Sequence, residues 1–223
     1  LAAKADAQLA ASLQTAVSDL LEAAARTGSL TIETVAGDNV VNATEAAALT
    51  LSGTVASDTT AVVLSIGGRE VTANVAGGRW TYSLTADDRT ALGADGAKLV
   101  TVTATLANGG GESASRPFQL DTAAPAAPAF ALVGDSGTSS TDGVTRDGTM
   151  TVTGLSVGAS WEYSTDGGTT WAAGSGTTFS LAAGNYLAGQ IMVRQTNATG
   201  NVSAPSASMS AYLVDNAPPT GLA

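Results

Sequence analysis

Acidic and amide side chains recur where predicted strands end, and they are the residues of this sequence best suited to chemistry. In two segments, 120–125 and 214–219, an alternating apolar run ends and is followed by an aspartate. A proline, which stiffens the backbone, comes within four residues of each aspartate. The aspartates, Asp121 and Asp215, lie 94 positions apart, which is the length of a small domain. Carboxylate and amide oxygens are ligands that Ca²⁺ prefers. The chemistry indicated is therefore cation binding at the end of a repeated domain.

The composition narrows the classes of function. The 223 residues include no histidine and no cysteine, which excludes Ser-His-Asp triads, Cys-His dyads, thiolate zinc sites and imidazole-bound metals. Nine basic against 19 acidic residues give a net charge of −10, so nucleic acid and anionic membranes are poor partners. No apolar run is long enough to insert into a membrane. A carboxylate-only hydrolase would need paired acids in a cleft, and we expect a protein that is not an enzyme.

The first segment, residues 1–28, differs from the rest and predicts one α-helix. Its apolar residues recur at three- and four-residue steps in an alanine-rich background. Gly28 supplies a helix stop just after Arg26. This helix could pack on the next domain, continue an upstream helical bundle or form a weak coiled coil. Because Leu1 is not an initiator methionine, we expect a piece of a longer chain. The apolar stripe comprises Leu9, Leu13, Val17, Leu20, Leu21 and Ala24.

From residue 29 onward the apolar period changes to two, which predicts two tandem immunoglobulin-like antiparallel β-sandwiches. The first domain is expected over residues 29–121 and the second over 122–215, with 216–223 starting a linker to a next repeat. Gly67-Gly68 is expected to form a two-residue hairpin turn. Strands are predicted at 29–35, 48–55, 61–66, 69–75, 79–84, 98–106 and 112–120, and then at 127–132, 149–153, 159–164, 169–172, 177–181, 189–196 and 206–214.

The topology of such sandwiches predicts which acidic segments meet. The loop between the first two strands and the end of the last strand lie at the same end of a sandwich. The loop between the last two strands lies at the opposite end, so loop 197–201 of the second domain faces the exit end of the first. We predict one Ca²⁺ at this junction from the convergence of the set; the alternative, for any one of these residues alone, is that it only shapes a turn or begins the linker. The predicted ligands are Asp38, Asn39, Glu45, Asp121 and Asn197.

The same logic predicts half a calcium site at the far end of the second domain. Its ligands would come from the loop after the first strand and from the end of the last strand. The remaining ligands would come from a following domain. The predicted residues are Asp135, Asp142, Asp147 and Asp215.

Several segments together resemble the bacterial immunoglobulin-like repeats of giant secreted biofilm and RTX-type surface adhesins, over about residues 30–219. They are 35–45, 121–128, 141–149, 161–171 and 193–201. The resemblance implies a secreted or cell-surface location and repeats that act as spacers in cell adhesion and biofilm formation. It also implies calcium at domain junctions. The partners implied are neighbouring repeats of the same chain, with host or matrix contacts made by other regions. Asn197 departs from the family pattern, which often has aspartate there.

Two alternatives rest on the aromatic residues of the second domain. Segment 164–171 matches the Asp-box of sialidase propellers, but one copy makes no propeller, and Asp166-Gly167 is a turn signal by itself. Trp161, Tyr163 and Trp171 could instead form a sugar-binding platform, which would make the chain a carbohydrate- or protein-binding module of a secreted protein. Alternation sends Trp161 and Tyr163 to the same face, and a tryptophan on the third strand favours the core.

Overall fold

The structure is a computed structural model that describes residues 2–26, 30–137 and 139–217. The chain divides into two compact units. One comprises Leu1–Val41 and Glu45–Asp121, and the other comprises Asn42–Thr44 and Thr122–Ala223.

The N-terminal segment forms one helix, α1 (Ala2–Arg26), as its spacing of apolar residues predicts. Leu9, Leu13 and Val17 on its apolar stripe are exposed. The predicted stop at Gly28 lies outside the described residues. No helix in the described part of the chain has the length and apolar character needed to cross a membrane.

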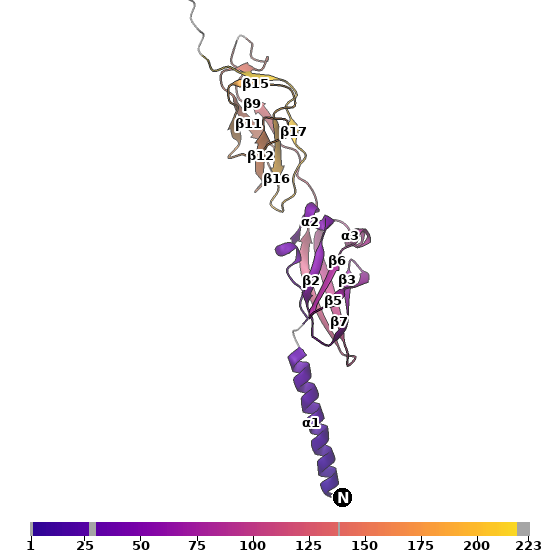
Figure 1. Cartoon of the computed structure of the whole chain (residues 1–223). Coiled ribbons are helices and arrows are strands. Elements are labelled where there is room, and N and C mark those ends of the chain that lie inside the picture. Colours follow the sequence, from indigo (N-terminus) through magenta and orange to yellow (C-terminus); the bar gives the residue numbers. More distant parts are fainter. Residues whose placement is uncertain (1, 27–29, 138, 218–223) are drawn as a thin grey trace, which may run out of the picture. The chain divides into compact units, whose positions relative to one another are not determined.

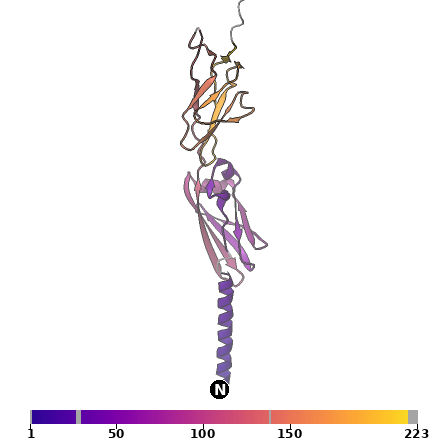
Figure 2. The same cartoon turned by 90° about the vertical axis from the view of Figure 1, so that its left-hand side faces the viewer.

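The first unit contains a sandwich of two sheets, and Figure 1 and Figure 2 show them from two sides. One sheet has the strand order β1-β8-β7-β3-β4, and the facing sheet has the order β2-β6-β5. These orders match the two sheets of an immunoglobulin-type sandwich, which confirms the predicted fold class. The strands are β1 (Val40–Val41), β2 (Thr50–Thr54), β3 (Thr59–Ile66), β4 (Arg69–Thr72), β5 (Asn74–Ala76), β6 (Arg79–Ser83), β7 (Gly96–Leu106) and β8 (Gly111–Leu120).

Alternating side chains build the core of this sandwich. On β3 the residues Val62, Leu64 and Ile66 are buried, while the residues between them are only partly covered. Trp80 is fully buried, and its Nε1 donates to the carbonyl of Thr31 at 2.9 Å. Burial of each large apolar side chain contributes about 1.5–3 kcal/mol. The indole hydrogen bond satisfies the one polar atom that this core tryptophan brings.

The turns and breaks of the first sandwich differ in part from the predicted strands. Gly67-Gly68 joins β3 to β4, and its φ angles of 55° and 83° are those of the predicted two-residue hairpin turn. The predicted strand 69–75 was wrong as one element, because it divides at Ala73 into β4 and β5, which belong to different sheets. The predicted strand 29–35 donates two hydrogen bonds to β2 but ends in a 3₁₀ turn, Val35–Gly37.

Two short helices within residues 43–92 had not been predicted. They are α2 (Ala43–Ala47) and α3 (Ala86–Leu92). Thr85 caps α3, since its side chain accepts from the amide of Asp88 while the Asp88 carboxylate accepts from the amide of Thr85.

The second unit forms a smaller sandwich. Its sheets have the orders β14-β11-β9, β13-β12-β16-β17 and β10-β18-β15. Trp161 and Tyr163 point into its core, where Tyr163 stacks on Phe179 at 4.4 Å, so the prediction that both face the core is confirmed. The strands are β9 (Ala129–Leu132), β10 (Val144–Thr145), β11 (Thr149–Thr153), β12 (Ser160–Ser164), β13 (Ala172–Ala173), β14 (Thr178–Ser180), β15 (Gly184–Tyr186), β16 (Met192–Thr196), β17 (Ser206–Ala207) and β18 (Tyr212–Val214).

Two predicted strands of this unit were wrong in their extent. Segment 206–214 is not one strand, because the chain leaves β17 in one sheet and joins another as β18. Segment 169–172 contributes only Ala172 to β13, since the residues before it form a turn around Asp166. Close packing also constrains the backbone here: a Cβ on Gly174 would lie 2.2 Å from the Trp161 ring.

Candidate functional site

A short parallel strand pair recurs in both units and positions most of the predicted ligands. In the first unit β1 pairs in parallel with β8, with Val40 opposite Gln119 and Val41 opposite Leu120. In the second unit β10 pairs in parallel with β18 in the same register, with Val144 opposite Leu213. Asp38 therefore corresponds to Asp142, and Asp121 corresponds to Asp215. The two units therefore repeat each other in structure as well as in sequence.

Asp38 and Asp142 each shape the turn that begins the parallel pair. The Oδ1 of Asp38 accepts from the amide of Val40 at 2.9 Å, and the Oδ1 of Asp142 accepts from the amide of Val144 at 3.0 Å. The residues between, Asn39 and Gly143, have φ angles of 64° and 75°. Aspartate and a left-handed residue are the usual components of such turns. Asp38 and Asp142 therefore each help to form the turn that leads into the parallel pair.

Asn39 lies beside a cation. Its Oδ1 accepts from the amide of Val35 at 3.2 Å and from Nη1 of Arg116 at 3.5 Å. A guanidinium at that distance repels a second positive charge. The position of Asn39 therefore favours a structural role over calcium coordination.

The register separates the predicted ligands of the first unit into two groups. Asp121 follows β8, and its amide donates to the carbonyl of Val41 at 3.0 Å. Asp38 precedes β1, so it lies at the opposite end of the parallel pair from Asp121. Glu45, in the first turn of α2, follows β1 at the same end as Asp121. The geometry therefore groups Glu45 with Asp121, and their shared ion stays a prediction.

The acids of the second unit form the same two groups. At the end of the parallel pair, the amide of Asp215 donates to the carbonyl of Thr145 at 2.8 Å, two residues before Asp147. The Oδ1 of Asp147 accepts from the side chain and amide of Thr149, which lowers the pKa of Asp147. The Oδ1 of Asp215 accepts from the amide of Ala217. Both carboxylates are exposed and lie past the same strand ends.

At the start of that pair, Asp135 lies next to the turn that Asp142 shapes. The Oδ2 of Asp135 accepts from the amide of Gly143 at 2.9 Å. Its Oδ1 is buried and has no hydrogen-bond partner among the described residues. Asp135 and Asp142 line a surface pocket of about 590 Å³ together with the hydroxyl side chains of Ser140 and Thr141. A buried acceptor without a donor is costly unless something else, such as a cation, satisfies it.

Asn197, the predicted ligand from the second domain, organises its own loop. Its Oδ1 accepts from the amide and hydroxyl of Thr199 and from the amide of Asn201, at 3.2, 2.8 and 2.8 Å. Its Nδ2 donates to the carbonyl of Ala123 at 3.4 Å. Three donors already occupy the oxygen that would bind calcium, so coordination would require the loop to rearrange. The role of Asn197 as a ligand stays a prediction.

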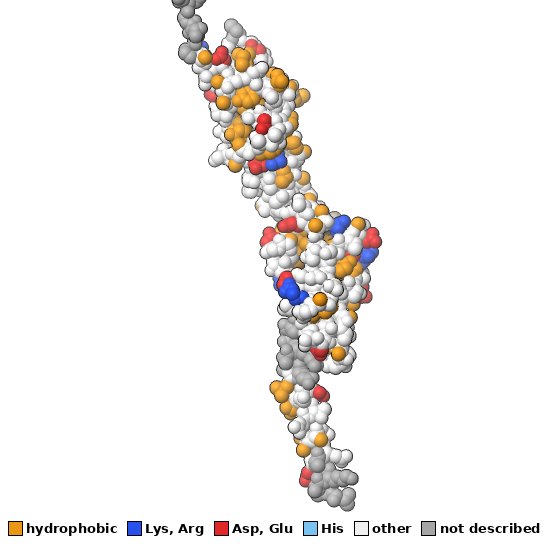
Figure 3. Space-filling view, viewed as in Figure 1, with side chains coloured by type: hydrophobic (Ala, Val, Ile, Leu, Met, Phe, Trp, Pro, Cys, Tyr) orange, Lys and Arg blue, Asp and Glu red, His pale blue; other side chains and the backbone are white. Residues whose placement is uncertain are grey.

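The charged side chains do not gather into a ready cluster. Among the described residues, no group of three or more Asp or Glu side chains is placed to hold a metal ion. On the face drawn in Figure 3, the acidic side chains of each unit are dispersed, and several lie next to lysine or arginine side chains. A cation site built from the described residues would therefore combine one or two carboxylates with backbone carbonyls or water.

The Asp-box segment is a hydrogen-bonded hairpin. Asp166 accepts from the hydroxyl and amide of Thr170 and from the hydroxyl of Ser164. These hydrogen bonds, led by the one from the Thr170 hydroxyl, lower the pKa of Asp166 to about 2. A carboxylate held ionised in this way cannot act as a general acid near neutral pH. Its geometry is that of a turn.

Trp171 is engaged with its own sheet. The guanidinium carbon of Arg194 lies 4.0 Å from the ring centroid, and Arg194 pairs with Glu162 through Nε and Nη2 at 2.9 and 2.8 Å. The indole Nε1 donates to the carbonyl of Gly168 at 3.0 Å. Because arginine covers one ring face, that face cannot serve as a platform for a sugar.

Replacing Trp171 with alanine is expected to lower the free energy of unfolding of the second unit by about 1 kcal/mol, since a partly exposed cation–π contact contributes about 0.5–1 kcal/mol. Guanidinium unfolding followed by circular dichroism measures this change in the free energy of unfolding. Trp171→Phe is the control that keeps an aromatic face. Unchanged stability together with lost binding on a glycan array would instead support a carbohydrate-binding module.

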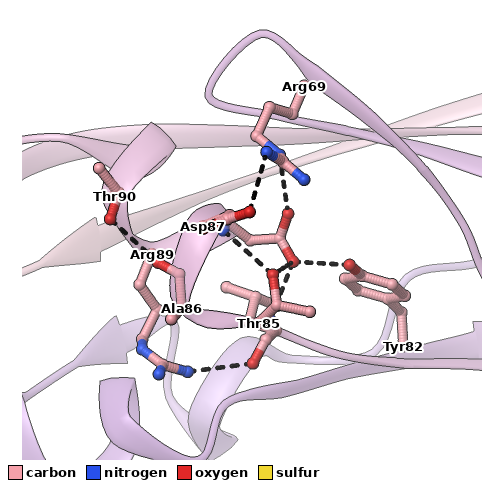
Figure 4. Close-up of polar contacts among 9 residues, drawn as sticks. Arg69, Tyr82, Thr85, Ala86, Asp87, Arg89 and Thr90 are labelled. Carbon is pink, nitrogen blue, oxygen red and sulfur yellow. Dashed lines mark hydrogen bonds and ion pairs between the residues drawn. The ribbon is translucent and has the colours of Figure 1, made fainter.

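The strongest polar cluster of the first unit had not been predicted and is drawn in Figure 4. It centres on Asp88 in α3, whose side chain is fully buried. Its Oδ2 accepts from the hydroxyl of Tyr82 at 2.6 Å and from the hydroxyl and amide of Thr85 at 2.7 and 2.9 Å. Its Oδ1 pairs with Nε of Arg69 at 3.1 Å. The four-residue segment Thr85-x-x-Asp88 is a capping-box signal that the sequence does contain.

Burial by itself would raise the pKa of Asp88. The hydrogen bonds from Tyr82 and Thr85 and the charge of Arg69 outweigh burial and lower that pKa to about 2. The hydrogen bond to Asp88 also raises the pKa of Tyr82. With all its partners satisfied, this carboxylate joins α3 to the β3–β4 hairpin and to β6, and its role is structural.

The chain is similar to solved structures of bacterial adhesins. No family model matches it, and no curated protein does. One similar structure concerns the host cell surface retention of a 1.5-MDa bacterial ice-binding adhesin, at 24% identity over 82% of this chain and 63% of that one, with a TM-score of 0.48. A second, a Ca²⁺-stabilized adhesin with which an Antarctic bacterium binds ice, is 22% identical over 83% of this chain and 48% of that one, with a TM-score of 0.45.

A third similar structure is a bacterial immunoglobulin-like domain of the M. primoryensis ice-binding adhesin, at 28% identity over 40% of this chain and 93% of that one, with a TM-score of 0.29. The chain thus spans about two thirds or less of the length of the first two structures.

Proposed function

We propose that the chain is a spacer module in the stalk of a large bacterial surface adhesin, and that calcium bound at the ends of its sandwiches rigidifies the array. The observation that carries the proposal is the repeated register of the parallel strand pairs. It puts an acid, Asp121 or Asp215, directly after the last strand of each unit. An acid also follows the first parallel strand, Glu45 four residues after Val41 and Asp147 two residues after Thr145. A repeated cation site suits a repeated spacer.

The residues present fit calcium better than other metals. All of the candidate ligands offer oxygen, and flexible coordination by carboxylates, carbonyls and water is what Ca²⁺ accepts. In the second unit we assign the end site to Asp147 and Asp215, and a second site to Asp135 and Asp142. The buried Oδ1 of Asp135, which no described donor satisfies, supports the second assignment.

Calcium would supply positive charge where carboxylates otherwise repel one another. In the first unit the assigned residues are Glu45 and Asp121, and the contribution of Asn197 stays a prediction. Because ligands from neighbouring repeats of the same chain would share an ion, binding and straightening would be one linked equilibrium. One of the similar structures is described as Ca²⁺-stabilized, and the proposal extends that property to this chain.

The proposal includes a secreted or cell-surface location and a role in cell adhesion and biofilm formation. A stalk needs stable, repeated domains and no catalytic cleft of its own. Contact with a host or a biofilm matrix is assigned to other regions of the full protein.

Thermal unfolding of the whole chain in millimolar calcium and in chelator tests the sites. Free calcium at 100 times its Kd should stabilise a binding unit by about 2.7 kcal/mol. For a unit of this size each 1 kcal/mol raises the melting temperature by about 4–8 °C. Asp121→Asn should remove the effect from the first unit only. Asp215→Asn should reduce it in the second unit only, and Asp215→Asn combined with Asp135→Asn should remove it there, because each variant disables one of the two assigned sites.

The matched control is Asp6→Asn, which removes an exposed carboxylate from α1. Equal melting temperatures in calcium and in chelator, for protein that is folded in both, would contradict the assigned sites. Small-angle scattering tests the stiffening separately: the maximum dimension should increase with calcium, and an unchanged dimension would rule out rigidification.

A further inference from the structure

We propose that Asn108, in the turn between β7 and β8, converts itself to aspartate and isoaspartate when the Gly109 backbone nitrogen attacks its side chain. This modification site needs no enzyme, metal ion or cofactor. The reaction goes beyond the proposed stalk function and does not depend on it. Its product carries one more negative charge than the −10 of the unaltered chain.

The sequence of this turn supplies an accessible nucleophile. Asn108 is the only asparagine of the chain that precedes a glycine. Because glycine has no Cβ, its backbone nitrogen is the one that a neighbouring side chain can approach most closely. The residues from Ala107 to Gly111 are all exposed, so water can reach the reacting groups. The turn thus combines the least hindered nitrogen with a supply of water.

The turn also folds the side chain of Asn108 over the following backbone. Its Oδ1 accepts from the amide of Gly110 at 2.8 Å. An asparagine bonded to the amide two residues further on lies across the peptide unit between them, which here contains the Gly109 nitrogen. A Cβ on Gly110 would lie 3.0 Å from that Oδ1, so glycine at this position favours the close approach.

The hydrogen bonds of the turn favour the addition and leave the nucleophile accessible. Negative charge develops on Oδ1 of Asn108 when nitrogen adds to Cγ, and the Gly110 amide already donates to that atom. The amide of Gly109 donates to the carbonyl of Leu106 at 3.0 Å, and this bond must open before the nitrogen loses its proton. Since the bond lies in an exposed turn, its opening is a local motion of low free energy.

The reaction proceeds in two balanced steps. The deprotonated Gly109 nitrogen bonds to Cγ of Asn108, the bond from Cγ to Nδ2 breaks, and ammonia leaves with the proton, which gives a cyclic imide. Water then opens the ring. Attack at Cγ gives aspartate, and attack at the backbone carbonyl carbon gives isoaspartate. One water is consumed, one ammonia is released, and nothing is oxidised or reduced.

The equivalent turn of the second unit lacks these features. Asn197 lies between β16 and β17, as Asn108 lies between β7 and β8. The next residue is Ala198, whose Cβ hinders the nitrogen, and three donors from Thr199 and Asn201 hold the Oδ1 of Asn197. Asn197 should therefore stay unmodified, and it serves as the matched internal control.

Incubation of the whole folded chain at mildly alkaline pH tests the proposal. Peptide mass spectrometry that separates isoaspartate from aspartate follows each asparagine. Asn108 should react at least about tenfold faster than Asn197 and the other asparagines, because only its neighbour lacks a Cβ. The rate should rise about tenfold with each unit of pH, since the deprotonated nitrogen is the nucleophile. Equal rates at Asn108 and Asn197 would overturn the proposal.

Two variants separate reaction in the folded turn from reaction in unfolded chains. Leu51→Ala, in the buried core of the facing sheet, lowers stability away from the turn, so the rate at Asn108 should stay within about twofold. A rate that rose with the unfolded fraction would contradict reaction in the folded turn. Asn108→Gln would need a larger ring, and it should lack the additional acidic species that anion exchange separates. Persistence of that species would also refute the proposal.

The isoaspartate product should loosen the turn, because it routes the backbone through Cγ and adds one atom. Hydrogen exchange should then accelerate at the amide of Leu106, which donates to the carbonyl of Gly110 at 2.8 Å. The modification should proceed equally in calcium and in chelator. Loss of the calcium effect would therefore contradict only the proposed calcium sites, and an unreactive Asn108 would contradict only the modification.

Discussion

Replacing Asp88 with alanine is expected to lower the free energy of unfolding of the first unit by about 3–4 kcal/mol. The carboxylate is fully buried, and its removal leaves the Tyr82 hydroxyl and the Thr85 amide without their acceptor and Arg69 without its buried partner. Leaving a buried donor without its acceptor costs about 1–3 kcal/mol for each group, and losing a helix cap costs about 1 kcal/mol, whereas the half-exposed Arg69 can be solvated. Guanidinium unfolding followed by the fluorescence of Trp80 measures the change, because Trp80 lies in the core of this unit.

The control is the neighbouring acid. Asp87 is 80% exposed and lies 3.7 Å from Nη1 of the same Arg69, so Asp87→Ala should change stability by less than about 0.5 kcal/mol. Similar losses in the two variants would mean that the buried network contributes no more than a surface pair.

The pH dependence of stability provides a separate test of the same cluster. The pKa of Asp88 is about 2 in the folded protein, against an ordinary value of 3.8. A lowered folded-state pKa adds stability that is complete above about pH 4 and is lost as the pH falls toward 2. The shift corresponds to about 2 kcal/mol. Asp88→Asn should therefore show a correspondingly smaller loss between pH 4 and pH 2 than the unaltered protein.

Local patterns were sufficient to predict most of the fold. Alternation on β3 and β7 and the glycine pair between β3 and β4 predict paired antiparallel strands, and the structure contains them. The inward position of Trp161 follows from the same alternation. These features depend on neighbours in sequence, so one sequence is enough to infer them.

The elements that were missed depend on contacts between distant residues. β1 and β10 have two residues each, which is too short for any period to appear, and they exist because a last strand lies beside them. Between β17 and β18 the chain passes from one sheet to another, and the alternation of apolar residues in 206–214 does not reveal this change. The parallel pairs also decide which acids are close together, and so the separation of Asp38 from Asp121 could not be predicted.

Replacing Gln195 with methionine is expected to lower the free energy of unfolding of the second unit by about 3 kcal/mol. The side chain of Gln195 on β16 is fully buried. Its Oε1 accepts from the amide of Ser156 at 2.8 Å, and its Nε2 donates to the carbonyls of Ala126 and Gly154 at 2.7 and 3.1 Å. Methionine has a similar volume but leaves these backbone groups unpaired, at about 1–3 kcal/mol for each that water cannot reach.

The loss of stability should be concentrated in the backbone segments to which the Gln195 side chain is hydrogen-bonded. Ala126 lies just before β9, so the side chain fixes the start of the first strand to the sheet that contains β16. Hydrogen exchange at the amide of Ser156 should accelerate more than exchange at the core amides of β16, because local opening then no longer breaks a buried hydrogen bond.

Gln190 provides the matched control. Its Oε1 accepts one hydrogen bond, from the amide of Leu187 at 2.7 Å, at an exposed position. Gln190→Met should therefore cost less than about 1 kcal/mol, since water can replace the lost acceptor. If Gln195→Met were no more costly than Gln190→Met, the buried amide would not be what anchors the first strand of this sandwich, and packing around Trp161 and Phe179 would have to position it.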